Sequence, residues 1–213
     1  MLCLAGAGSG KTRVLTERIA SLIHRGVAPG HILTVTFARK AAGEIRTRLE
    51  SLVPPDQASL VHMGTFHSIG LTILKEFGAL AQLPERPLLT PQDNMQRRVS
   101  RILEAHESPL LEHDGSRAIG EAITSVKLML PLHLDPDAGL EAYRSPPPEL
   151  MRQLWEAGTY SVQPPAALLP IFSAYQEEMA DEGLLDFQDL LSIPTLLLNG
   201  RPGVRDRLRD RWR

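Results

Sequence analysis

Apolar residues recur along the first third of the chain with periods that alternate between those of helices and those of buried strands. From position 12 to position 24 they fall three or four residues apart, which predicts a helix, and segment 39–52 repeats that spacing. Segment 31–37 is mostly β-branched or apolar and 2–5 is a short apolar run, so both are predicted to be buried strands. This order predicts a parallel α/β sheet covered by helices on both faces.

A change of pattern further along the chain indicates an insertion. Segment 61–65 is predicted as a third strand and 68–80 as a helix, but twelve of the seventeen prolines then lie between Pro84 and Pro170, where strand-like alternation is not evident. The segments predicted there as proline-bounded helices are 92–106, 115–130, 147–157 and 165–182. Asp186–Leu198 is predicted to return to the first domain. We therefore expect a core (1–84), a mostly helical insertion (85–183) and a return to the core (184–213).

Charge is distributed unevenly, although the net charge is only -2. Residues 1–75 hold nine basic and four acidic residues, which gives +5, whereas 76–200 hold eight and nineteen, which gives -11. The basic first third is the part that favours binding to polyanions, while the acidic middle is equally well explained by solvated helix faces. The six arginines of 201–213 predict either an amphipathic helix or a tail that binds nucleic acid.

Other features of the composition exclude several classes of protein. The hydrophobic fraction is 43% and the charged fraction 23%, which is typical of a globular protein, and no apolar run has the roughly 18–20 residues that cross a bilayer. The single cysteine, Cys3, excludes an internal disulfide framework and cannot form a structural zinc site alone. A cytoplasmic location is expected, since the start resembles no cleavable signal.

A glycine-rich segment between the first predicted strand and helix fits the phosphate-binding P-loop pattern, with Ala5 in the first glycine position. Glycines let the backbone wrap around phosphates, and the following helix adds its positive end. Lys11 is expected to neutralise phosphate charge and Thr12 to ligate Mg²⁺ through its hydroxyl. The predicted nucleotide-binding residues are Ala5, Gly6, Ala7, Gly8, Ser9, Gly10, Lys11, Thr12 and Arg13.

Four blocks, in order, resemble superfamily 1 DNA helicases of the UvrD/Rep/PcrA group. They are Leu4–Leu15 around the P-loop, Ile32–Ala42, Gly64–Ser68, and the weaker Leu185–Leu191, and together they span nearly the whole chain. The resemblance implies a RecA-like P-loop sheet with an inserted subdomain, ATP and Mg²⁺ as cofactors, and a 3′-to-5′ DNA translocase as the activity. It also places Arg13 near the nucleotide.

The resemblance further implies that segments 36–40 and 65–68 line a path for single-stranded DNA. Phe37 would stack on a base, while hydroxyl groups reach phosphates. A plain core position is the alternative for Phe37, and a structural histidine is as good an explanation of His67 as a DNA contact. The predicted nucleic-acid residues are Thr36, Phe37, Arg39, Lys40, Thr65, Phe66, His67 and Ser68.

Several departures from the family pattern qualify these roles. Position 39 is arginine where the family usually has asparagine, and the acidic insertion argues against the duplex-holding role that relatives imply. An apolar strand ending in Asp-Glu, needed to hold Mg²⁺ and activate water, is not found in these residues, and we expect the second motor domain to be missing from them as well. We therefore expect a truncated motor that contacts ATP phosphates and single-stranded DNA without hydrolysing ATP.

Two other functions compete with this hypothesis. One is a stand-alone P-loop module that binds nucleic acid or protein and does not hydrolyse ATP. The other is a small kinase that uses Asp186 or Asp189 as its metal carboxylate, although a kinase has no use for the blocks at 32–42 and 64–68.

Overall fold

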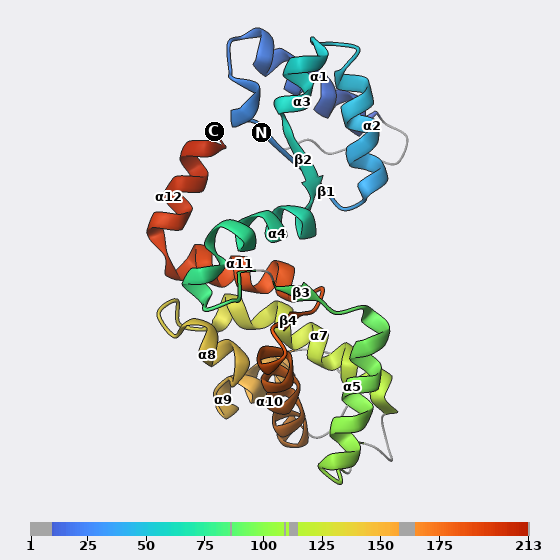
Figure 1. Ribbon diagram of the computed structural model, residues 1–213, viewed down its shortest axis with the longest axis vertical. Coiled ribbons are helices and arrows are strands. Elements are labelled where there is room, and N and C mark those ends of the chain that lie inside the picture. The colour runs from blue at the N-terminus through green and yellow to red at the C-terminus, as the bar shows by residue number, and fades with distance from the viewer. Residues whose placement is uncertain (1–9, 86, 109, 111–114, 158–164, 213) are drawn as a thin grey trace. The chain divides into compact units, whose positions relative to one another are not determined.

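The computed structural model describes residues 10–85, 87–108, 110, 115–157 and 165–212. The fold is mixed α/β, mostly helical, with two small parallel sheets (Figure 1). The chain forms two compact units, of which one comprises Met1–Ile69 with Arg205–Arg213 and the other Gly70–Val204. The division into 1–84, 85–183 and 184–213 stays a prediction.

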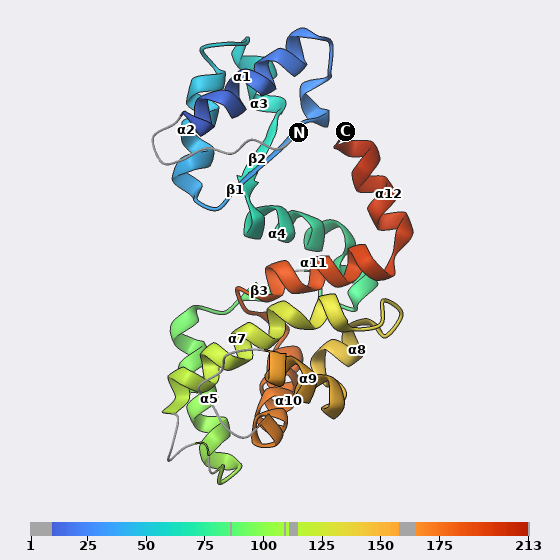
Figure 2. The ribbon, with the colours of Figure 1, turned by 180° about the vertical axis from the view of Figure 1, so that it is seen from behind.

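The first unit is built on two parallel strands, β1 (Leu33–Thr36) and β2 (His62–Thr65), which pair over their full length from Leu33–His62 to Thr36–Thr65. Helix α2 (Arg39–Leu49) follows β1 and packs against both strands, and it also contacts α1 (Lys11–His24) (Figure 2). Helices 12–24 and 39–52 and strands 31–37 and 61–65 are thus confirmed to within a few residues. The predicted strand 2–5 lies outside the described residues.

Helix α1 shows why the local sequence suffices for these elements. Thr16, Ile19, Ala20 and Ile23 are its buried residues, spaced to lie on one face. The helix ends before Gly26, whose φ of 89° is a left-handed conformation that glycine adopts without strain. The first unit's core is completed by residues of the other elements: Ile32, Ile45, Leu49, Val53, Ala58 and Val61.

Three further elements contribute to the first unit. The six-residue helix α3 (Pro55–Leu60), which the sequence pattern did not predict, leads into β2, and a single 3₁₀ turn, η1 (Pro29–His31), precedes β1. Helix α12 (Pro202–Arg211) shows that the arginine-rich end is helical, and binding of nucleic acid by this segment stays a prediction. In its last turn the carbonyl of Arg211 lies 2.7 Å from Nδ1 of His31, and the ring of Trp212 meets that of His62 edge-on at 5.5 Å.

The second unit is a bundle of helices. Helix α4 (Phe66–Phe77) enters it and continues into the 3₁₀ turn η2 (Gly78–Ala81). The helices predicted for the insertion are confirmed as α5 (Gln92–Ala105), α7 (Gly115–His133), α9 (Pro148–Ala157) and α10 (Pro165–Asp181). The sequence did not predict α8 (Gly139–Arg144), α11 (Asp189–Gly200), or the two-residue parallel strands β3 (Leu88–Leu89) and β4 (Leu184–Leu185).

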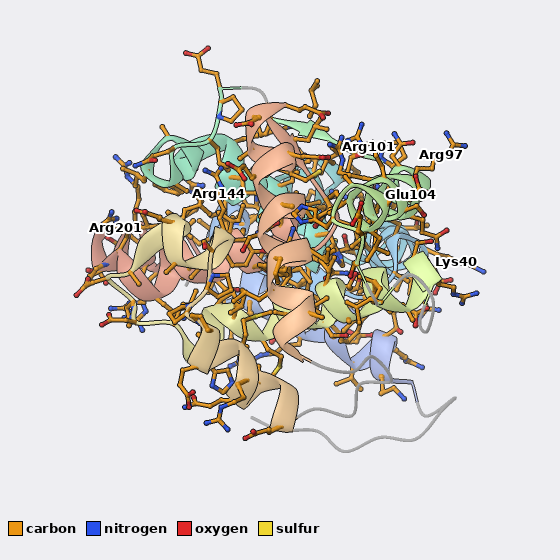
Figure 3. All side chains as sticks on the ribbon, turned by 90° about the horizontal axis from the view of Figure 1, so that it is seen from below. Lys40, Arg97, Arg101, Glu104, Arg144 and Arg201 are labelled. Atoms are coloured by element: carbon orange, nitrogen blue, oxygen red, sulfur yellow. The ribbon has the colours of Figure 1, made fainter. Side chains whose placement is uncertain are left out.

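Helix α7 lies between α5 and α11 in this bundle, as both ribbon views show. On the outside of α5, Arg97, Arg101 and Glu104 are exposed (Figure 3). Arg98 donates hydrogen bonds to Glu178 and Glu182, and Arg101 donates to Glu178, so these pairs connect α5 with the end of α10. None of the helices that the structure describes is long and apolar enough to cross a membrane.

Candidate nucleotide and nucleic-acid sites

The start of α1 carries the described part of the predicted P-loop, since Ala5, Gly6, Ala7, Gly8 and Ser9 lie outside the described residues. Gly10 precedes the helix with φ 84° and ψ 19°, a left-handed conformation that strains any residue with a β-carbon. Neither a side-chain cap nor an acidic residue occupies the first turn of this helix. Its N–H groups and the positive end of its dipole therefore suit an anion.

Three of the predicted side chains, Lys11, Thr12 and Arg13, lie in the first turn of this helix. Lys11 and Arg13 are exposed and Thr12 is half-exposed. Thr12 contributes its carbonyl to the helix by accepting a 2.8 Å hydrogen bond from Oγ1 of Thr16. Arg13 lies 3.9 Å from Glu17, a separation at which two exposed charges interact only weakly. A phosphate group beside Lys11 and a cation beside the Thr12 hydroxyl stay predictions.

The carboxyl ends of β1 and β2 bring the two predicted DNA segments together. Because the strands are parallel and Thr36 pairs with Thr65, residues 37–40 and 66–68 emerge at the same edge of the sheet. Each strand is followed within three residues by a helix, α2 or α4, so two helix N-termini meet there. Ligands of open α/β sheets bind at this kind of edge.

Two phenylalanines form the most exposed apolar feature of this edge. Phe37 is 93% exposed and Phe66 is 47% exposed. Their ring centroids are 5.2 Å apart with an interplanar angle of 48°, a favourable tilted contact. The core alternative for Phe37 is therefore wrong. Its ring meets Phe66 in this tilted contact and is otherwise presented to solvent.

The three hydroxyl groups at this edge shape the two turns. Thr36 Oγ1 donates a 2.9 Å hydrogen bond to the carbonyl of Ala38, and Ser68 Oγ donates a 2.8 Å bond to the carbonyl of Thr65. Thr65 Oγ1 accepts a 3.2 Å bond from the N–H of Ser68, so it caps α4. A hydroxyl has one proton to donate, and Thr36 and Ser68 already use theirs within the chain.

Charged and imidazole groups flank the aromatic pair. Arg39 and Lys40 are exposed in the first turn of α2, which has neither an acidic residue nor a side-chain cap, and Lys40 projects from the surface in Figure 3. His67 is half-buried, and burial lowers the pKa of its imidazole below the usual value of 6.5, so the ring is mostly neutral at pH 7. The positive charge at this edge therefore comes from Arg39 and Lys40.

Gly64 is a feature of this edge that the sequence pattern alone did not explain. A β-carbon at Gly64 would lie 2.3 Å from Oγ of Ser68, so a side chain would displace the hydroxyl that bonds to Thr65. A glycine inside a predicted strand is the available signal, because it often marks a close approach. The contact between Phe37 and Phe66 had no such signal.

The acidic residues that the kinase alternative requires are used in the fold. Nζ of Lys127 lies 2.5 Å from Oδ2 of Asp186 and 2.7 Å from Oδ1 of Asp189, and all three side chains are buried. Tyr175 donates to Asp186 and Tyr143 donates to Asp189, each at 2.9 Å. With their lone pairs so occupied, the carboxylates do not face a metal, and the kinase hypothesis is wrong. Among the described residues, no group of three or more histidine, cysteine, aspartate or glutamate side chains could hold a metal ion.

Comparison with known proteins gives a consistent result. The family model described as UvrD/REP helicase N-terminal domain matches residues 1–213. ATP-dependent DNA helicase UvrD1 of Mycobacterium tuberculosis (strain ATCC 25618 / H37Rv) is 31% identical over the whole chain and 25% of its own length. PcrA of Staphylococcus aureus (strain NCTC 8325 / PS 47) is 30% identical over the whole chain and 26% of its own length. Srs2 of Schizosaccharomyces pombe is 31% identical over 93% of the chain and 22% of its own length. The chain thus spans about a quarter of these curated relatives.

Proposed function

The chain belongs to the UvrD/REP helicase family, and from that premise we propose that it supplies the phosphate-binding loop and part of the single-stranded DNA path of an ATP-dependent DNA helicase. The names of the relatives support ATP dependence and action on DNA, since UvrD1, PcrA and Srs2 are all ATP-dependent DNA helicases. Strands β1 and β2 are then two neighbours of a RecA-like parallel sheet. Translocation in the 3′-to-5′ direction belongs to the same proposal.

The observation that carries the DNA part is the exposure of Phe37 at the end of β1. A ring that is 93% exposed gains nothing for the fold, but it offers a flat face to a base of any sequence. Arg39 and Lys40 lie next to it and attract the phosphate backbone. This combination of an aromatic platform and a cationic rim is typical of sites that bind single strands without sequence preference.

The hydrogen bonds at this edge refine the roles of its hydroxyl groups. Thr36 and Ser68 hold the two turns in shape, and the phosphates are bound by Arg39, Lys40 and the first N–H groups of α2. Thr65 is buried and caps α4 as an acceptor. Phe66 supports the aromatic platform from the start of α4, and His67 follows it on that helix.

The nucleotide part rests on the start of α1. Lys11 pairs with the β- and γ-phosphates, Thr12 holds the Mg²⁺ that accompanies ATP, and Arg13 lies against the nucleotide. Bound Mg²⁺ would neutralise charge that develops on the phosphates. Asp186 and Asp189 cannot replace the carboxylates that relatives use for hydrolysis, because both are tied to Lys127. The chain by itself therefore binds ATP without turning it over.

The test is a pair of measurements on the purified chain with ATP, Mg²⁺ and an excess of oligothymidylate. Fluorescence anisotropy should show that a labelled single strand binds more tightly than a blunt duplex of the same length, and released phosphate should stay at the background level. Binding without turnover is also expected of a stand-alone module, so joining the chain to the further domains of a full-length relative, PcrA, distinguishes the motor fragment from the module. Hydrolysis that then depends on Lys11 supports the motor. Equal affinity for both DNA forms would overturn the single-strand path.

A further inference from the structure

Arg46, a half-buried residue of α2, reaches the segment that leads into β2. Its Nη1 donates a 3.2 Å hydrogen bond to the carbonyl of Ala58, near the end of α3, and its Nη2 donates a 3.4 Å bond to the carbonyl of Val61. Ala58 and Val61 are themselves buried in the core of the first unit. One guanidinium thus joins α2 to two points of the chain just before β2.

These bonds matter because of what lies at the other ends of the joined elements. Helix α2 begins two residues after Phe37, and β2 ends one residue before Phe66. Arg46 is therefore a link between the element that follows one aromatic ring and the element that precedes the other. Movement of β2 along β1 would change the 5.2 Å separation of the two rings.

Only arginine among the cationic residues suits this role. Its planar fork presents several N–H groups in fixed directions, so two carbonyls three residues apart can be bonded at once. A lysine ammonium is a point charge on a flexible chain and would hold one carbonyl at a time. The carbonyl of Ala58 is also near the end of a six-residue helix, where a cation is favourable.

We infer that Arg46 is a positioning residue of the single-stranded DNA site: it fixes the start of β2 against α2 and thereby sets Phe66 against Phe37. This inference rests on the proposed function. Arg46 acts through the main chain and does not contact the nucleic acid. Phe66, held with its ring centroid 5.2 Å from that of Phe37, then limits the positions that Phe37 can take, so less freedom is lost when a base stacks on it.

The experiment is a double-mutant cycle on the purified chain, with anisotropy of a fluorescein-labelled oligothymidylate as the readout. Arg46→Met removes both bonds and should weaken binding about three- to tenfold, less than the loss of the stacked base itself. Arg46→Lys keeps the charge and should recover part of the affinity. Arg48→Met is the matched control, because Arg48 is an exposed cation of the same helix, and it should change the affinity less.

Testing Arg46→Met in the Phe37→Ala chain distinguishes a positioning role from a general loss of folded protein. In the Phe37→Ala chain, Arg46→Met should have almost no further effect, whereas general loss of folded protein would weaken binding equally in both backgrounds. The salt dependence gives an independent check. A direct phosphate contact by Arg46 would reduce the slope of log affinity against log salt by about 0.7, and positioning leaves the slope unchanged.

The outcomes separate the positioning role of Arg46 from the proposed DNA site at Phe37. Loss of binding in Phe37→Ala, with full binding in Arg46→Met, overturns the positioning role and leaves the proposed function standing. Full binding in Phe37→Ala overturns the proposed DNA platform itself. If circular dichroism shows that Arg46→Met does not fold, Arg46→Lys replaces it in the double-mutant cycle with Phe37→Ala. Additive effects of Arg46→Lys and Phe37→Ala on the binding free energy would reject the inference.

Discussion

The ammonium of Lys127, in the middle of α7, lies 2.5 Å from Oδ2 of Asp186, a residue 59 positions later in the chain. Asp189 completes the group at 2.7 Å from the same nitrogen, and two tyrosine hydroxyls bond to the carboxylates. Burial by itself lowers the pKa of Lys127, but the attraction of the two carboxylates is stronger and leaves the pKa raised. The group is therefore a charged connection that joins α7, α8, α10 and α11.

Lys127→Met should destabilise the second unit by about 3–5 kcal/mol, because it leaves two carboxylates buried without their cation. Urea unfolding followed by circular dichroism measures this loss, with Lys75→Met on the exposed side of α4 as the control. Protonation removes the charge of the unpaired carboxylates of Asp186 and Asp189 in the variant. The loss of unfolding free energy should therefore be smaller at pH 4 than at pH 7. A variant as stable as the parent chain would show that the buried ion pairs contribute nothing.

Alkaline pH should unfold the second unit through its buried tyrosines. Burial, followed by the negative charge of Asp189 for Tyr143 and of Asp186 for Tyr175, raises the pKa of both phenols above the usual value of 10. Because the pKa of both phenols is raised in the folded state, the stability that the protonated phenols contribute is complete below about pH 10. It is lost as the pH rises further. Tyrosinate absorbance of Tyr143 and Tyr175 should therefore appear together with the loss of helical signal. Ionisation of both residues in the folded chain would contradict the expectation.

Gly70→Ala should disrupt the contact between α4 and α11. A β-carbon at Gly70 would lie 1.7 Å from the carbonyl oxygen of Leu190, a main-chain atom that cannot move aside cheaply. We expect a loss of about 1–3 kcal/mol or more in thermal unfolding experiments. Gly43→Ala is the matched control, since Gly43 lies inside α2 with no atom within 4 Å of the new methyl group. Alanine there should stabilise the helix by up to about 1 kcal/mol.

Phe37→Ala should weaken the binding of single-stranded DNA by about 1–3 kcal/mol, which is the value of one stacked base. The fold should be unaffected, because the ring is 93% exposed. Leu60→Ala offers a comparison, since Leu60 is an exposed apolar residue of the same unit. Anisotropy at low salt measures both variants. Unchanged affinity in Phe37→Ala would mean that no base stacks on this ring.

Lys11→Ala should weaken the binding of Mg²⁺-ATP by at least about tenfold, because a hydrogen bond from a charged group is worth about 1.5–3 kcal/mol. Fluorescence of a labelled ATP analogue measures the affinity. Arg18→Ala removes an equal charge from an exposed position of the same helix and should have little effect. Retained ATP affinity in Lys11→Ala would refute the assignment of the phosphate loop.

Local sequence was sufficient for helices with a clear apolar face. The helix predicted over 12–24 is observed as Lys11–His24 because its buried residues repeat at helical spacing. Helix α11 was not predicted, since Leu190, Ile193, Leu196 and Leu197 are buried among other apolar residues and leave no period to detect. The six-residue helices α3 and α8 are too short to show a period.

The amino-acid sequence was enough to predict the type of chemistry from a glycine-rich turn before Lys11 and Thr12 and from an aromatic residue and two cations after an apolar strand. The contact of Phe37 with Phe66, and the pairing of Asp186 and Asp189 with Lys127, came only from the folded chain. These contacts join residues far apart in the chain. Local periodicity carries no information about which strand edges or buried charges come together when parallel strands and helices pack.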